Sequence, residues 1–390
     1  MKKSLLALFV ASLVSSTQAY SATVYDKDGT SLKLDGRIQS VLYHSTETKQ
    51  KAGESDNTLV NSARFGIGGE TKLKDFKFKA YTQWDMADGS KRTGDNIKAR
   101  DQYLQVSYGK FGSLKLGRFK GAMNYVTSVT DVFDDYSANA QSANDERNSG
   151  RIEYAYSNKG FDAKVGLLTS NDEYKLENGY GYSDHKKAAV ENGASIALGY
   201  TFDLALPLSV KAGYEFIGAQ DDKKYYDALD SDHYHNKNDL DKVNTAAASV
   251  TLGSIDSGLY AALTVNNRTF SFRVKDGNDK ADEDFKARGF EAVVGYTFES
   301  GIGLRAGYNQ MNYKQDRVVR LNDVDTKVDA KLKTFPVYAF YQANPNFIVW
   351  SEARFDATSD NDRALMKKAN INTPYSTDKT AVSLGARYLF

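Results

Sequence analysis

The chain has 390 residues, of which 51 are basic and 50 acidic, and its formal net charge is +1. This balance indicates no nucleic acid or other polyanion as a partner. Cysteine is absent, so an exported form must be held together by hydrogen bonds and packing. The chain has 26 tyrosines, 30 glycines and only 4 prolines, which suits either a soluble β-sandwich or a barrel with aromatic girdles.

The N-terminus has the pattern of a secretory signal. Residues 1–3 are basic, residues 5–14 are almost wholly apolar, and Thr17 and Ala19 are the small residues that a signal peptidase reads. The apolar run is too short to span a bilayer, and no later stretch is long enough for a transmembrane helix. We therefore expect a signal peptide at 1–19 and one domain at 20–390.

After the signal, apolar residues recur at every second position, as in strands with one apolar face. The first such face carries Leu32, Leu34, Ile38 and Leu42, and the opposite face carries Lys33, Asp35, Arg37 and Gln39. The alternation continues through 62–72, 76–85, 196–202, 208–216, 290–298 and 382–390, but is poor in 98–108. Parity alone does not say whether the apolar face meets a core or lipid.

The connections between these segments decide the question, because short turns alternate with long polar loops. Short turns are expected at 74–75, 157–160, 203–207, 254–258, 299–301 and 343–346. Long loops are expected near 46–58, 88–98, 119–147, 170–193, 217–242, 270–287, 313–329 and 357–379. Short periplasmic turns and long extracellular loops are typical of a transmembrane antiparallel β-barrel. The segments therefore predict an all-β fold of about sixteen strands.

Charged residues on the polar face indicate a constriction in the lumen. Parity places Arg37, Arg64 and Arg151 there, and we assign Arg100 to the same wall from the poorly alternating strand. The segment after the fifth strand contains an acidic run with Asp131, Asp134 and Asp135. If it folds inward, these face the arginines and create a transverse field. Otherwise the arginines are simply solvated and the acidic segment lies on the surface.

Arg118 stands out because it shares a face with Leu114 and Leu116, away from the lumen. A charge that faces lipid at mid-depth is costly. Contact with a neighbouring subunit, near Asp88 or Asp95 of the second loop, would relieve this cost.

Several stretches resemble the enterobacterial type of general diffusion porin. They are VYDKDG at 24–29 with LDGR at 34–37, ARFGIGGET at 63–71, GSLKLGR at 112–118 and the C-terminal YLF. The resemblance implies sixteen strands, a homotrimer and a third loop folded into the pore. It also implies a water-filled channel in the cell outer membrane, through which small hydrophilic solutes and ions diffuse passively.

Matched by position, the resemblance assigns roles to the charged residues. Arg37 falls where the family has a lumenal lysine, and the other three arginines fall on its arginine ladder. Asp131 and Asp135 fall on the acidic pair of the third loop. The family's Pro-Glu-Phe-Gly-Gly run is replaced by DDYSA at 134–138, which leaves the path of the loop and the pore radius open.

The C-terminus carries a further expectation. Tyr388 and Phe390 share a face with Leu384 and Ala386, and this pattern resembles the signal that barrel-assembly machinery recognises. A plain final strand would look the same. Outer-membrane lipid and lipopolysaccharide are the other expected partners.

Other functions find less support. A barrel enzyme would need a nucleophile, a base and an orienting group, and no such arrangement is apparent. A substrate-selective channel remains the alternative, although most aromatics have the outward parity and the third loop is acidic. The long loops could also act as an adhesin surface. His185, His233 and His235 do not have the spacing of a metal site, and we expect neither a metal nor a cofactor.

Overall fold

The computed structural model describes most of the chain. The described residues are 21–45, 58–88, 96–137, 139–144, 146–176, 187–220, 238–276, 279–321, 324–368, 371 and 380–390. Within them, no helix has both the length and the apolar character needed to cross a membrane.

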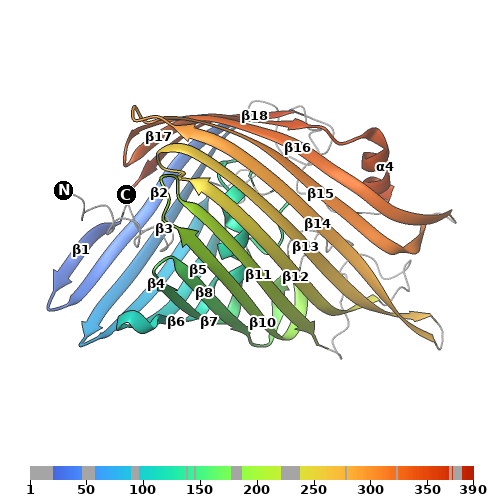
Figure 1. Ribbon diagram of the computed structural model, residues 1–390, viewed down its shortest axis with the longest axis horizontal. Coiled ribbons are helices and arrows are strands. Elements are labelled where there is room, and N and C mark those ends of the chain that lie inside the picture. Colours follow the sequence, from blue (N-terminus) through green and yellow to red (C-terminus); the bar gives the residue numbers. More distant parts are fainter. Residues whose placement is uncertain are drawn as a thin grey trace.

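The chain forms a ring of antiparallel strands that follow one another in sequence order (Figure 1). The first nine are β1 (Ala22–Lys27), β2 (Thr30–Ser45), β3 (Thr58–Leu73), β4 (Phe76–Ala87), β5 (Ile97–Tyr108), β6 (Ser113–Lys120), β7 (Arg147–Asn158), β8 (Phe161–Leu168) and β9 (Asn171–Lys175). The others are β10 (Lys187–Phe202), β11 (Leu208–Ala219), β12 (Asn238–Gly253), β13 (Gly258–Asp276), β14 (Asp279–Thr297), β15 (Ile302–Leu321), β16 (Val324–Asn344), β17 (Phe347–Asp356) and β18 (Ala381–Leu389). The helical elements are η2 (Gly109–Phe111), α3 (Ala122–Thr127), η3 (Ser128–Thr130) and α4 (Asp360–Lys368).

The wall of the ring has sixteen strand positions among the described residues. β8 and β9 pair in succession with β10, so they form one interrupted strand. β1 pairs with residues 30–34 of β2, and β18 pairs with residues 37–45 of β2. The first and last strands therefore share one position, and the prediction of a sixteen-stranded barrel is confirmed.

A glycine makes this closure possible. The backbone of Gly36 exchanges two hydrogen bonds with that of Phe390, at 2.7 and 3.0 Å. A Cβ atom at Gly36 would lie 2.5 Å from Cζ of the Phe390 ring. Only glycine leaves room there for the C-terminal aromatic side chain.

The outer face of the barrel is apolar, which is the reverse of a soluble sandwich. In β10, Ile196 and Leu198 are each 44% exposed, whereas the intervening Ala197 is fully buried. Exposed aromatics gather near the short turns, where Tyr200 lies 4.8 Å from Phe202 and Tyr296 lies 4.7 Å from Phe298 between ring centroids. This is the aromatic girdle of a membrane barrel, so the apolar parity faces lipid.

Two of the expected loops are strand hairpins in the structure, and the loop expected near 170–193 contains β9 and the start of β10. Residues 270–287 and 313–329 lie mostly in long hairpins, because β13 runs to Asp276 before β14 begins at Asp279, and β15 runs to Leu321 before β16 begins at Val324. Their inward residues, such as Phe270 and Tyr313, are fully buried. The strands continue above the lipid-facing part, where an outer face can be polar and the pattern resembles a loop. The short turn between β5 and β6, which contains η2, was not predicted.

Candidate pore constriction

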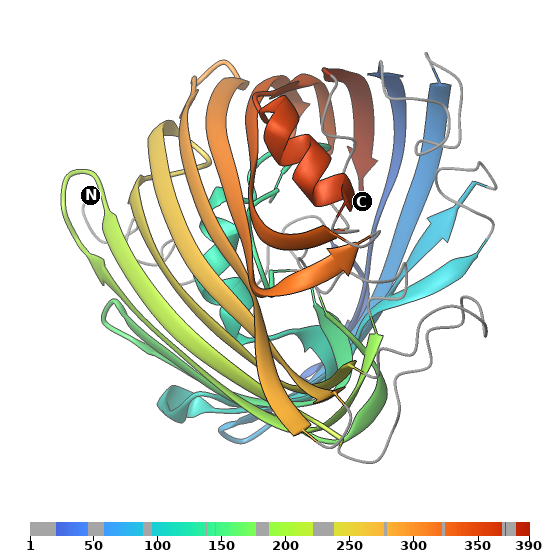
Figure 2. The ribbon, with the colours of Figure 1, turned by 90° about the vertical axis from the view of Figure 1, so that its right-hand side faces the viewer.

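The third loop, residues 121–146 between β6 and β7, folds into the barrel. Its helix α3 lies against β8 and β10–β13, and η3 lies against β12–β14; both belong to the teal segment seen inside the ring in Figure 2. The apolar face of α3, including Met123 and Val126, is buried against Ala197 and Ala247. Burial of these side chains anchors the start of the loop.

Tyr125 adds a polar contact to this anchor. Its hydroxyl donates to Oδ2 of Asp162 at 2.8 Å. Burial, together with the hydrogen bond to this carboxylate, raises the pKa of Tyr125 well above its ordinary value. The phenol therefore stays protonated and remains a donor.

Two carboxylates of the barrel wall hold the rest of the loop. Glu352 on β17 accepts the backbone N–H groups of Asp134, Asp135 and Tyr136 at 2.8, 2.9 and 2.6 Å. Three successive amides on one carboxylate fix the backbone path of the acidic segment.

Glu291 on β14 is the second clamp. It accepts from Oγ1 of Thr130 at 2.6 Å, from the backbone N–H of Ala140 at 2.8 Å and from Nε2 of Gln141 at 2.6 Å. Neither clamp was predicted from the sequence. Their only signal was a carboxylate on a lumenal face, which does not distinguish a clamp from a solvated residue.

The three predicted carboxylates do come together in the loop, but each has partners. Asp134 bonds Nη2 of Arg387 and the hydroxyl of Tyr338, both at 2.6 Å. Asp131 accepts from Nδ2 of Asn144 at 2.9 Å. The acidic segment is therefore bound to its surroundings and is not a freely solvated loop.

Asp135 is the most strongly anchored of the three. Its carboxylate accepts from Oη of Tyr43 at 2.7 Å, Nε1 of Trp350 at 2.9 Å and Oγ of Ser383 at 2.6 Å. These donors come from β2, β17 and β18. Asp135 thus connects the tip of the loop to the region where the ring closes.

The structure brings three of the four predicted arginines to one part of the wall. Arg37 and Arg64 are register partners on β2 and β3. Arg64 and Arg100 each bond Asp85, both at 2.7 Å. Asp85 keeps a side-chain exposure of 39%, against 16% and 18% for these arginines. Asp85, which was not singled out from the sequence, is therefore more accessible than the two arginines that it bonds.

Arg151 lies elsewhere, and its assignment to the lumen-lining wall needs correction. Its side chain is only 5% exposed, and it bonds Oη of Tyr174 at 2.7 Å and Glu215 at 3.4 Å. Parity predicted the inward direction but not that other segments cover this position. Arg387, which bonds Asp134 and Gln39, is a lumenal arginine that the assignment omitted.

The remaining predicted residues lie on the outer face of the barrel or where β18 closes the ring against β2. Arg118 is half-buried, and its Nε donates to the carbonyl of Arg100 at 2.9 Å. Asp88 accepts the backbone N–H of Asn61 at 2.8 Å, and Asp95 lies outside the described residues. Tyr388 is exposed on the outer face.

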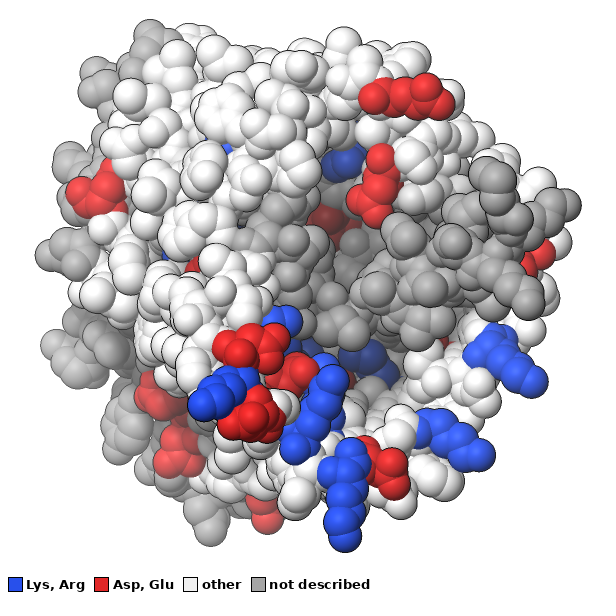
Figure 3. Space-filling model, turned by 90° about the vertical axis from the view of Figure 1, so that its left-hand side faces the viewer, with Lys and Arg blue, Asp and Glu red and all other residues white. Residues whose placement is uncertain are grey.

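Viewed along the barrel, the molecule is hollowed at its centre, with both signs of charge around the hollow (Figure 3). Among the described residues no group of three or more His, Cys, Asp or Glu side chains could hold a metal ion. The three histidines considered as metal ligands lie outside the described residues. A barrel with an apolar outer face and charged residues around a central hollow defines the class of membrane channel.

Comparison of the chain with known protein families and sequences identifies its family. The model of the Gram-negative porin family matches residues 5–273, so the chain belongs to that family, whose members are outer-membrane channels and not enzymes. Outer membrane protein F of Serratia marcescens is 26% identical over 374 residues, covering 93% of this chain and 94% of its own. Outer membrane porin PhoE of Klebsiella pneumoniae is 27% identical over 401 residues, and both chains are covered completely.

Solved structures agree on the fold. OmpF of Salmonella typhi, solved in complex with daunomycin, has a TM-score of 0.68 at 20% identity and covers 95% of this chain and 100% of its own. OmpT of Vibrio cholerae, solved in a trimer form, has a TM-score of 0.59 at 15% identity, covering 93% of this chain and 100% of its own. The predictions of family, fold and outer-membrane location are confirmed.

Proposed function

We propose that this general porin passes small hydrophilic solutes between a wall of Arg37, Arg64 and Arg100 and the clamped third loop. The observation that carries the proposal is the pair of clamps, because Glu291 and Glu352 hold the loop inside the lumen through six hydrogen bonds. A loop held this way narrows the passage by a fixed amount.

The charges around the passage are unevenly balanced. Asp134 is paired with Arg387, and Asp135 is surrounded by neutral donors. On the nearby strands β3 and β5, two arginines share one carboxylate, Asp85 of β4. We infer a field directed across the pore from the arginine cluster towards Asp135, and this field orients dipolar solutes as they pass.

We also propose that the channel assembles as a homotrimer through the outer face of β2–β6. That face carries a polar stripe, in which Ser40 bonds Asn61 at 2.6 Å and Gln102 bonds Thr82 at 3.3 Å. Arg118 stands beside Gln102 in the strand register. Polar groups are costly against lipid, and contact with a second subunit would remove them from it.

The two ends of the chain complete the proposal. Residues 1–19 act as a cleaved signal peptide and residues 20–390 form the barrel. Tyr388 and Phe390 serve as the signal for barrel-assembly machinery, and the outer face contacts lipid and lipopolysaccharide.

The test is conductance of the purified protein in a planar bilayer. A general porin gives an ohmic conductance that rises with salt concentration and closes in three steps. Saturation of the current, with block by one class of solute, would instead support a substrate-selective channel. Absence of any conductance from correctly folded protein would contradict the proposal.

A further inference from the structure

The half of the lumen towards the long loops contains an apolar core, which we call the mouth core. Apart from Tyr174 of β9, its members on the barrel wall come from β8 and β10–β16 and are buried: Leu168, Ala188, Val190, Ile217, Leu240, Val243, Phe270, Phe272, Phe285, Ala287, Met311, Tyr313, Val328, Ala330 and Leu332. The lumen of a porin is expected to be polar. An apolar lining there is stable only if something covers it.

Strand parity shows that these residues point inward. In β13, Leu263 and Val265 are exposed on the lipid side, and Phe270 and Phe272, of opposite parity, are buried. Phe285 continues the stack, with ring centroids 6.2 Å from Phe270 and 6.0 Å from Tyr313. The aromatic layer therefore crosses three neighbouring strands on the inner side of the wall.

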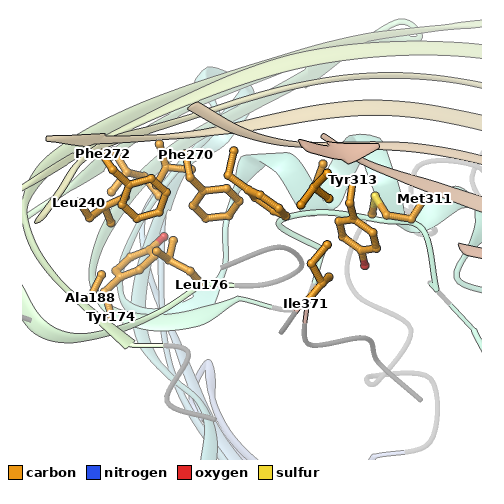
Figure 4. Close-up of a cluster of buried hydrophobic side chains, with 14 of the residues drawn as sticks. Tyr174, Leu176, Ala188, Leu240, Phe270, Phe272, Met311, Tyr313 and Ile371 are labelled. Carbon is orange, nitrogen blue, oxygen red and sulfur yellow. The ribbon is translucent and has the colours of Figure 1, made fainter. Parts of the chain in front are cut away.

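Two segments cover this lining (Figure 4). Tyr174 and Leu176, at the end of β9, are essentially inaccessible. From the other side come Met366 of α4, which is 2% exposed, and Ile371, which is 9% exposed. We call α4 with Ile371 the strap.

Polar contacts hold the strap in place. Ser359 caps α4 by accepting the backbone N–H of Asp362 at 3.1 Å. Asp362 in turn accepts the backbone N–H of Lys331 on β16 at 3.0 Å. Arg363 bridges to Asp356 on β17 at 3.4 Å. These contacts fix the helix to the rim of the barrel with Met366 facing the mouth core.

An ionic layer connects the mouth core to the third loop. Arg268 pairs with Glu146, Arg151 pairs with Glu215, and Arg151 also bonds Tyr174. All five side chains are buried. Buried charges persist only when paired and well surrounded, so protein also fills this side of the lumen at the level below the mouth core.

We propose that the strap and the mouth core are a second size filter, at the extracellular end of the channel. They fill the lumen along β8–β16 and confine solutes to the side formed by β17, β18 and β2–β6. This is the side that carries Arg37, Arg64 and Arg100, so the filter delivers solutes to the arginine wall. The inference rests on the proposed channel function and adds a determinant of specificity to it.

The test compares two variants of the same helix in a planar bilayer. Met366→Asp places a carboxylate in the mouth core, and Ala364→Asp places the same side chain on the exposed face of α4. An unpaired buried carboxylate should shift the equilibrium between docked and released strap by about 100-fold towards release. Neutral polyethylene glycols of graded size, added to one side at a time, then report the width of each entrance.

For Met366→Asp we expect a larger polymer cut-off from the extracellular side, an unchanged cut-off from the periplasmic side and a higher single-channel conductance. Ala364→Asp should match the unmodified protein in all three. If Met366→Asp does not fold, Met366→Ala gives the same test, with a smaller increase expected. If a folded Met366 variant and Ala364→Asp have equal extracellular cut-offs, the proposed filter is refuted. If the unmodified protein itself shows no conductance, the proposed channel function is refuted instead.

Discussion

The clamp at Glu352 gives the most quantitative prediction. Glu352→Ala removes the acceptor of three backbone amides in the third loop. A hydrogen bond to a charged group contributes at least about 1.5 kcal/mol, so the three together contribute roughly 4–5 kcal/mol. Each 1.4 kcal/mol is tenfold in an equilibrium constant, so the released form of the acidic segment should become about 1000-fold more populated. Water that enters the gap reduces this figure.

The assay is single-channel recording, because a segment that leaves and re-enters the lumen changes the current. We expect Glu352→Ala to show rapid fluctuations and a higher mean conductance. Ser351→Ala is the control, since Ser351 is the exposed neighbour on the lipid side of the same strand. Recordings of Glu352→Ala that cannot be told from those of Ser351→Ala would refute the argument that this carboxylate holds the loop.

Three further predictions concern the charged pore wall, the outer face at Arg118 and the closure of the ring at Gly36. Asp85→Asn leaves Arg64 and Arg100 without their shared carboxylate, so the reversal potential in a salt gradient should move towards anion preference; no movement would contradict its exposure to the pore. Arg118→Ala should lower the temperature at which the trimer dissociates in detergent, as followed by electrophoresis of heated samples, and an unchanged temperature would exclude the subunit contact. Gly36→Ala collides with the Phe390 ring and should reduce the yield of folded barrel in refolding assays, whereas Gly69→Ala, which meets no atom within 4 Å, should not.

Much of the fold was predictable because a barrel repeats one local rule. The alternation of Leu32, Leu34 and Ile38 with polar residues needs no tertiary information, and neither does the order of turns and loops. The rule fails above the lipid-facing part of the wall. There the outer face of a strand can be polar while its inner face is apolar, so the expected pattern is reversed. For this reason the long hairpins of β13–β14 and β15–β16 were mistaken for loops.

The site was less predictable than the fold. Parity gives the direction of a side chain but not what lies in front of it, so Arg64 and Arg151 looked equivalent. Only the structure shows that Tyr174 and Glu215 enclose Arg151. The clamps at Glu291 and Glu352 depend on where a distant loop arrives, more than 150 residues away in sequence in both cases. No local pattern carries that information.

The reversal potential of an arginine double variant tests the central claim most directly. Arg64→Ser combined with Arg100→Ser removes two positive charges from the proposed wall, and Arg288→Ser removes one from the outer face, where Arg288 is exposed. We expect the double variant to shift the reversal potential towards cation preference, while Arg288→Ser leaves it unchanged. An unchanged reversal potential in the double variant would contradict the placement of the arginine wall at the narrowest part of the channel.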